Sequence, residues 1–344
     1  MNPTNPGRAP VSLFTPQERQ SYAQRGLTLP LLLFLGVASG YAGLEVAVLA
    51  SPVWLAVPLS ILTGLAIAML FVVGHDAAHN SFTRLRWLNQ TIGRLAFLPA
   101  LHAFSLWDLT HNRVHHMANN LRGVDRGWEP MSPADYRSSS PFQRALYRLY
   151  RTPLGTALYY LPELWARRLV VPLPWIIGPT RPIYWFDTAF VLVGLAAQTA
   201  GAIAIGGAFG HHPWFSVLTG VAIPFLIWNM LISMAIFMHH THPSIPWYAT
   251  VAARDAASLA LQGTVHLTFP QPFGLFGLNI MEHNAHHSAS GVPLYRLKRF
   301  QAAIAAAHNV VAWTFSFRAY RRICRRCKLY DYDADCWVTF EGVA

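Results

Sequence analysis

Long apolar runs alternate with polar segments along this chain, and four of the runs are long enough to predict membrane-spanning helices. About 20 apolar residues in a helix cross the hydrocarbon core of a bilayer. The four runs cover residues 28–50, 53–74, 183–206 and 214–238. Short links join the first run to the second and the third to the fourth. The pattern therefore predicts an all-α membrane protein with four transmembrane helices in two hairpins.

The segments between and after these spans carry two shorter apolar stretches. Leu95–Leu106 contains Pro99 and His102, and Leu169–Ile177 is broken by prolines. Because proline interrupts a helix, we expect these stretches to lie at the membrane interface or to form re-entrant segments, packed against the spans. The chain shows no internal repeat and no low-complexity linker, so we expect residues 1–344 to form a single domain.

Composition agrees with a membrane protein. The 344 residues are 53% hydrophobic and 12% charged, whereas a soluble domain carries about 25% charged residues. Three cysteines are too few for a disulfide framework. The first 26 residues are polar and do not resemble a secretory signal.

The net charge of +11 follows the predicted topology and does not mark a surface for nucleic acid. Three Lys and Arg residues precede the first span, thirteen lie in 75–182 and ten lie from residue 239 onward, which accounts for all 26. None lies in a span or in a short link. An arginine at the centre of a membrane helix costs about 3 kcal/mol. The positive-inside rule then predicts that both termini and both long polar segments are cytoplasmic.

Eight of the 16 histidines lie in three clusters on that predicted cytoplasmic side. Residues four apart lie on one face of an α-helix, so His75 and His79 are expected to bind one metal or to bridge two. His111 and His115 have the same spacing, and His116 lies about 100° further round, toward a different metal. The third cluster has a three-residue step. The clusters are His75-x-x-x-His79, His111-x-x-x-His115-His116 and His283-x-x-His286-His287.

So many clustered histidines suit two metal ions better than one. Imidazole binds zinc, copper, iron and nickel, but the chain has no His-Glu-x-x-His zinc-protease motif. An all-nitrogen site beside hydrocarbon suggests iron that activates dioxygen. A metal transporter would instead place ligands along a path through the spans. Acidic residues near the clusters are candidates to orient the histidine rings, and they are Asp76, Asp108, Asp125, Glu129 and Glu282.

The clusters and their surroundings resemble the integral-membrane fatty acid desaturases, most closely the acyl-lipid omega-6 (delta-12) type. The three histidine boxes occur in the family order and spacing. The segments Gly74–Phe82, Trp128–Pro130 and Thr241–Tyr248 are also similar to the family's sequences around the boxes. The resemblance covers about residues 70–300. The chain departs from plant members at Ala77-Ala78, at Trp247 and at Ser288–Ser290, positions expected to line or support an acyl tunnel.

The resemblance implies four spans with a cytoplasmic helical cap that carries a di-iron site. It implies two Fe²⁺ ions and oxygen-dependent insertion of a cis double bond into the acyl chain of a membrane lipid. His242 and His266 are weaker ligand candidates than His240. A di-iron hydroxylase or ketolase acting on a fatty acid, carotenoid or sterol is the alternative. The implied iron ligands are His75, His79, His111, His115, His116, His240, His283, His286 and His287.

No stretch of the chain indicates a bound haem or flavin. Electrons are therefore expected from a separate carrier, a ferredoxin or a cytochrome b5-like protein. Cys324 and Cys327 form a single Cys-x-x-Cys within a basic run, and a membrane-surface segment explains that run better than a zinc site does. The acyl carrier, the bond position and the chain length are left open by the sequence.

Overall fold

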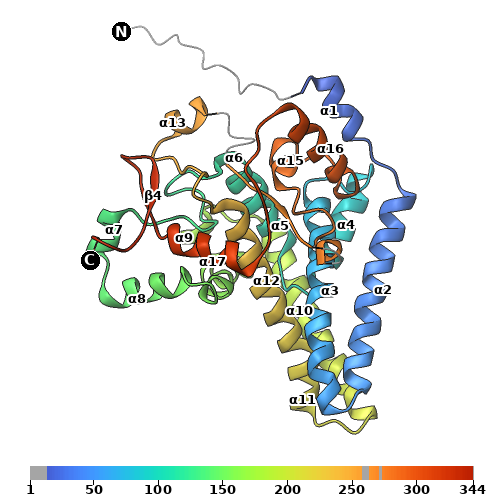
Figure 1. The fold of residues 1–344 in the computed structure, drawn as a ribbon. Coiled ribbons are helices and arrows are strands. Elements are labelled where there is room, and N and C mark those ends of the chain that lie inside the picture. The colour runs from blue at the N-terminus through green and yellow to red at the C-terminus, as the bar shows by residue number, and fades with distance from the viewer. Residues whose placement is uncertain (1–13, 258–262, 271–272, 344) are drawn as a thin grey trace.

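The computed structural model describes residues 14–257, 263–270 and 273–343, and most of these residues are helical (Figure 1). Four of its helices are long and apolar enough to cross a membrane. The fourth is continuous over Pro213–His240 and consists of α11, a π-helical stretch η4 and α12. The long elements are α2 (Thr28–Ala50), α3 (Val53–Ala78), α10 (Pro182–Ala208), α11 (Pro213–Val217), η4 (Leu218–Ala222) and α12 (Ile223–His240).

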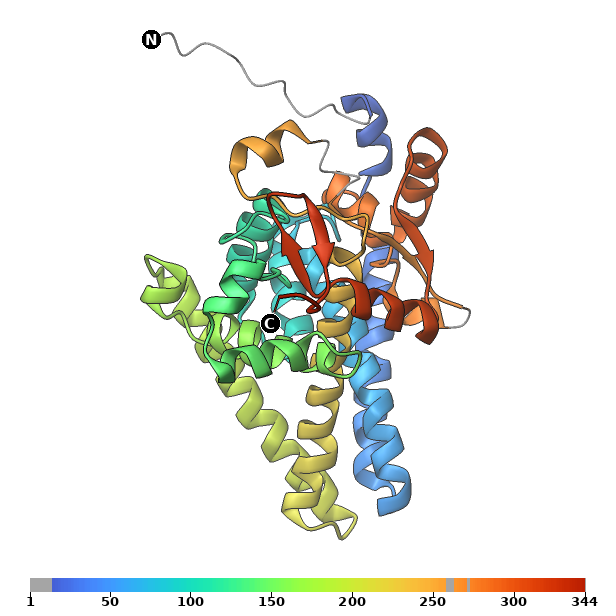
Figure 2. The same cartoon turned by 60° about the vertical axis from the view of Figure 1, so that its left-hand side comes forward.

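The long helices lie side by side below a broad layer of short helices, as the two views of the ribbon show (Figures 1 and 2). Helix α3 packs against both α2 and α12. A Cβ atom at Gly64 would lie only 2.7 Å from Cβ of Ile227 and 2.9 Å from the carbonyl oxygen of Pro224. A small residue at this position lets the two backbones approach closely, which is the common way for helices to associate in lipid.

The layer above the long helices consists of short helical segments. Two of them, η1 and η3, are π-helices, while η2 and η5 are 3₁₀-helices. The segments are α1 (Pro16–Tyr22), α4 (Arg86–Phe97), α5 (Phe104–Trp107), η1 (Asp108–His115), α6 (His116–Ala118), α7 (Pro133–Ser138), α8 (Pro141–Tyr150), η2 (Gly155–Ala157), η3 (Leu161–Leu169), α9 (Pro174–Ile177), α13 (Val251–Ala256), η5 (Phe273–Gly277), α15 (His283–Ser288), α16 (Leu294–Ala307) and α17 (Phe317–Arg326).

The structure extends two of the predicted spans at the end that carries histidines. Helix α3 continues from residue 74 to Ala78, and α12 continues from residue 238 to His240. His75 and His240 therefore lie within these helices and not directly after them. Polar side chains are tolerated here because they are buried in protein and do not face lipid, as with Asp76, which is 2% exposed.

The described residues are mostly helical, as expected, but they also include four short strands. Strand β1 (His266–Thr268) pairs in parallel with β2 (Ala312–Thr314), and β3 (Leu329–Asp331) pairs antiparallel with β4 (Cys336–Val338). Each strand has three residues, which is too short for an alternating pattern to be recognised in the sequence.

Helices α15 and α16 cover the histidine-bearing end of α3. The backbone N–H of Leu294, at the start of α16, donates to Oδ2 of Asp76 on α3 over 3.2 Å. Val73 and Ala77 of α3 share an apolar cluster with Ala285 of α15 and Phe300 of α16. These contacts hold the third histidine cluster directly over the first.

Candidate metal centre

The structure gathers all nine histidines that the resemblance implied as ligands, and it divides them into two groups. Within each group, the nitrogen atoms that could bind a metal all lie within 4.8 Å of one another. The first group comes from α3 and its C-terminal end, from the η1–α6 segment and from α15. The second group comes from η1, α12 and α15. The first group is His75, His79, His111, His116 and His286, and the second is His115, His240, His283 and His287.

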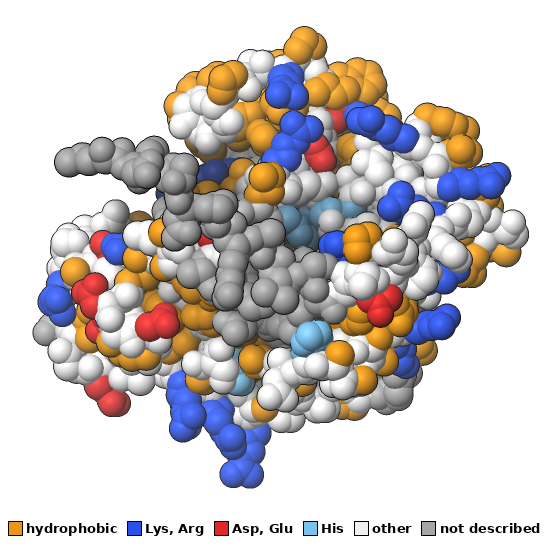
Figure 3. Space-filling view, turned by 90° about the horizontal axis from the view of Figure 1, so that it is seen from above, with side chains coloured by type: hydrophobic (Ala, Val, Ile, Leu, Met, Phe, Trp, Pro, Cys, Tyr) orange, Lys and Arg blue, Asp and Glu red, His pale blue; other side chains and the backbone are white. Residues whose placement is uncertain are grey.

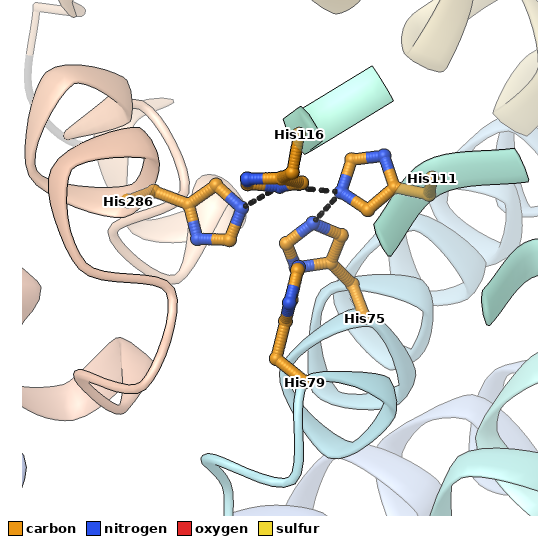
Figure 4. A group of neighbouring side chains, drawn as sticks. All are labelled: His75, His79, His111, His116 and His286. Carbon is orange, nitrogen blue, oxygen red and sulfur yellow. Dashed lines mark hydrogen bonds between the residues drawn. The ribbon is translucent and has the colours of Figure 1, made fainter. Parts of the chain in front are cut away.

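The five rings of the first group point toward a common centre (Figure 4). Nε2 of His111 lies 2.8 Å from Nε2 of His75 and 3.1 Å from Nε2 of His116. Nε2 of His116 also lies 3.0 Å from Nε2 of His286. An Nε2 atom carries either a hydrogen or a free lone pair, so this chain of three contacts cannot consist of three good hydrogen bonds. A cation between the rings would satisfy all of them.

The second group has a ring whose orientation is fixed by a carboxylate. His115 donates its Nδ1–H to Oδ1 of Asp125 over 3.0 Å, and this aspartate is fully buried. The bond sets the tautomer of His115 and leaves its Nε2 lone pair free for a metal, as in other histidine metal sites. Nε2 of His240 lies 3.0 Å from Nε2 of His283.

The division of the second cluster differs from the arithmetic of an α-helix. His111 and His116, five residues apart, share the first group, while His115 belongs to the second. The cause is that Asp108–His115 is a π-helix, in which the N–H of His116 donates to the carbonyl oxygen of His111. A π-helix aligns residues five apart and frequently occurs at functional sites.

The carboxylates of the other acidic candidates form no hydrogen bond with any of the nine histidines in the described part of the chain. Asp76 accepts from Ser81, Asp108 from Asn112 and Arg113, and Glu129 from Gly123 and Arg126. Glu282 lies 2.6 Å from Nε2 of His266, which is outside both groups.

Two further histidines near the end of α12 also lie outside the groups. The ring of His239 stacks on His283 with centroids 3.9 Å apart, and its Nε2 lies 3.2 Å from the sulfur of Met281. Nδ1 of His242 accepts from the backbone N–H of Ser244. The structure therefore favours His240 over His242 and His266 as the ligand that follows the fourth span.

The donor set fits two metal ions. Two nitrogens bound at right angles about 2.1 Å from one ion would be about 3.0 Å apart, close to the observed separations. Nε2 of His79 and of His287 is buried and has no hydrogen-bond partner in the described part of the chain. Burial lowers the pKa of His79, His111, His116, His283, His286 and His287 well below its usual value. These rings are thus neutral, which is the form that binds metal.

A largely apolar cavity reaches the metal centre between α3 and α12. Among its lining residues are His75, His111, His115, His239, His240 and His283. Sequence reasoning missed its other walls, because they come from segments far apart in the chain and share no local pattern. Those walls include Phe71, Trp107, Tyr160, Leu164, Trp228 and Ile232. Trp107 also stacks on His111, with ring centroids 4.6 Å apart.

The arrangement is two groups of histidines that could bind metal, beside an apolar cavity, and comparison with known proteins gives the chain a family. The family model for fatty acid desaturases matches residues 52–316, which include both histidine groups. The chain belongs to the fatty acid desaturase family. It is therefore an oxidoreductase of lipid metabolism, and with four apolar helices it is a membrane protein.

The relatives of this desaturase include proteins named as desaturases of lipid-linked acyl chains. It is 32% identical to the sn-1 oleoyl-lipid 12-desaturase of Picosynechococcus sp., over 88% of this chain and 83% of the relative. It is 27% identical to the chloroplastic omega-6 fatty acid desaturase of Arabidopsis thaliana, over 85% of this chain and 63% of that protein. It is also 27% identical to the sn-1 acyl-lipid omega-3 desaturase (ferredoxin) of Nostoc sp., over 73% and 68% of the two chains.

Proposed function

We propose that this protein is an oxygen-dependent acyl-lipid desaturase, which introduces a cis double bond into an acyl chain of a membrane lipid. The observation that carries the proposal is the position of nine histidines, in two groups, at one end of an apolar cavity between membrane helices. The names of the Picosynechococcus and Nostoc relatives agree with an acyl chain attached to a lipid.

Two iron ions are the proposed occupants of the two groups. Iron held by neutral imidazoles supplies the dioxygen chemistry that removes hydrogen from an unactivated methylene. The proposed ligands of one iron are His75, His79, His111, His116 and His286. Those of the other are His115, His240, His283 and His287.

The chain itself contributes positioning and the exclusion of water. Phe71, Trp228 and Ile232 line the cavity with apolar surface, so an acyl chain can enter while water is disfavoured. Trp107 packs on His111 and restricts the tilt of that ring. Because a displacement of about 1 Å can change a rate by orders of magnitude, these rigid aromatic walls select the carbon that reacts.

A separate electron donor completes the reaction. Removal of two hydrogen atoms from the acyl chain supplies two of the four electrons that reduce dioxygen to water. The other two come from a carrier, for which we propose a ferredoxin or a cytochrome b5-like protein. The name of the Nostoc relative contains ferredoxin, which favours the first.

We further propose that the four long helices form two transmembrane hairpins in a single domain, with the metal centre and both termini in the cytoplasm. All 26 Lys and Arg residues lie outside the long helices and their short links. Seen from above, the protein carries basic side chains spread over the face opposite the hairpin turns, with histidine visible near its centre (Figure 3). The positive-inside rule assigns this face to the cytoplasm.

Expression in a host that makes only saturated and monounsaturated lipids tests the function. We expect a new fatty acid two hydrogens lighter than its precursor, two irons per purified chain, and loss of both product and iron in His115→Ala. A product that has gained oxygen would indicate the alternative hydroxylase or ketolase. Fewer than one iron per chain, with His115→Ala still active, would rule out the di-iron proposal.

A further inference from the structure

Two arginines line the cavity that reaches the histidine groups. Arg126, in the loop after the second histidine cluster, and Arg168, in η3, both line this cavity. Leu164 and Leu169 of the same π-helix line it too. One cavity thus combines a long apolar wall with two guanidinium groups.

The two arginines differ in their ion-pair partners. Arg126 shares an ion pair with Glu129 over 2.8 Å and stays half exposed. Arg168 is half buried and pairs with no carboxylate among the described residues. Partial burial and the neighbouring charge of Arg126 lower the pKa of Arg168, as expected for a partly buried cation near a second cation.

Asp125 forms no ion pair with Arg126 or Arg168 in the described part of the chain. It is the one acidic side chain lining the cavity within the described part of the chain. Its carboxylate already accepts hydrogen bonds from His115 Nδ1 and from the backbone N–H groups of Asn120 and Gly127. The guanidinium of Arg168 is therefore available to an anionic group of an incoming ligand.

We propose that Arg126 and Arg168 form a phosphate-binding subsite that holds the phosphodiester of a glycerophospholipid while its acyl chain occupies the apolar cavity. The inference rests on the proposed desaturase function and names the substrate class. A guanidinium presents paired N–H donors that match two oxygens of a phosphate. A lipid without an anionic group would leave the charge of Arg168 partly buried and unpaired, which is costly. The phosphate of a pantetheine-linked acyl carrier has the same chemistry.

The matched control is the neighbouring Arg167. It lies next to Arg168 in η3 but does not line the cavity, and it pairs with Glu163 over 2.8 Å. Replacing either residue with glutamine removes one positive charge from the same helix. Only the change at position 168 removes a charge from the cavity.

Binding to the purified, iron-loaded protein tests the subsite without turnover. Native mass spectrometry would compare dioleoyl-phosphatidylglycerol, dioleoylglycerol and oleoyl-CoA. We expect the wild type to bind the phospholipid about tenfold more tightly than dioleoylglycerol. Arg168→Gln should abolish this preference, Arg168→Lys should keep part of it, and Arg167→Gln should keep all of it. Iron content and melting temperature of each variant report whether it has folded.

The outcomes separate the sources of the phosphate. Tighter binding of oleoyl-CoA than of the phospholipid, lost in Arg168→Gln, would support the subsite and assign it to a pantetheine-linked carrier. Equal binding of phospholipid and dioleoylglycerol by the wild type would overturn the inference, and so would an unchanged preference in folded Arg168→Gln. Because no step requires desaturation, failure of the proposed activity would leave this result interpretable.

Discussion

At the scale of single residues, the sequence identified the histidine candidates but not which of them lie in the same group. All nine lie in the two groups, yet His111 is grouped with His116 and not with His115. The carboxylate that orients a ligand ring was also beyond sequence reasoning. Five acidic residues lie near the clusters in sequence, and only Asp125 reaches a ligand histidine among the described residues.

Loss of the charge on Asp125 should weaken the second metal group. In Asp125→Asn, the ring of His115 loses the carboxylate that sets its tautomer, so we expect iron affinity or activity to fall by about 10- to 100-fold. Iron titration with a chelator would measure the affinity. The matched change Glu129→Gln alters a carboxylate that binds Gly123 and Arg126 but no ligand. Equal effects of the two changes would argue against the orienting role.

At the scale of helices, two features of backbone geometry build the site. The π-helix over Asp108–His115 changes which histidines share a face. Close contact between α3 and α12 brings His75 and His240 to the same end of the bundle. The apolar lengths of these helices were predictable, because crossing a bilayer requires them. The π-helix over Asp108–His115 and the close contact between α3 and α12 were not predictable, because they depend on packing partners distant in sequence.

Widening the contact between α3 and α12 should destabilise the centre. In Gly64→Ala, the new methyl group would lie 2.7 Å from Ile227 Cβ and 2.9 Å from a backbone oxygen. Such overpacking typically costs about 1–3 kcal/mol. We expect a lower melting temperature in detergent and a lower iron content. Gly36→Ala, on α2, meets no atom within 4 Å and should leave both unchanged. Similar losses in the two variants would contradict the packing argument.

At the scale of the whole molecule, the charge pattern and the positions of the histidines agree on one functional face. The long helices extend from one side of the cap, and both metal groups lie at the cap end of α3 and α12 (Figure 1). The cavity connects this end to the apolar helices.

A native cysteine reports the sidedness. Cys336 is exposed, whereas Cys324 and Cys327 are buried. We expect a membrane-impermeant maleimide to label Cys336 in inverted vesicles and not in right-side-out vesicles. In a Cys336→Ser background, Phe209→Cys, in the link between α10 and α11, should show the opposite pattern. Labelling of both positions from the same side would refute the proposed topology.

The sequence by itself determined the four apolar helices, the position of Lys and Arg outside them, and the histidine candidates. Each follows from local chemistry: hydrocarbon requires about 20 apolar residues in a helix, arginine avoids the bilayer core, and imidazole binds metal. Only the tertiary structure decided which histidines lie in the same group, which carboxylate contacts a histidine ring, and which residues line the cavity. These depend on distances between residues such as His116 and His286, 170 positions apart in the chain, and no local pattern encodes them. The two arginines of the cavity also depend on the tertiary structure. Arg126 and Arg168 line the same cavity only when the loop and η3 are folded together.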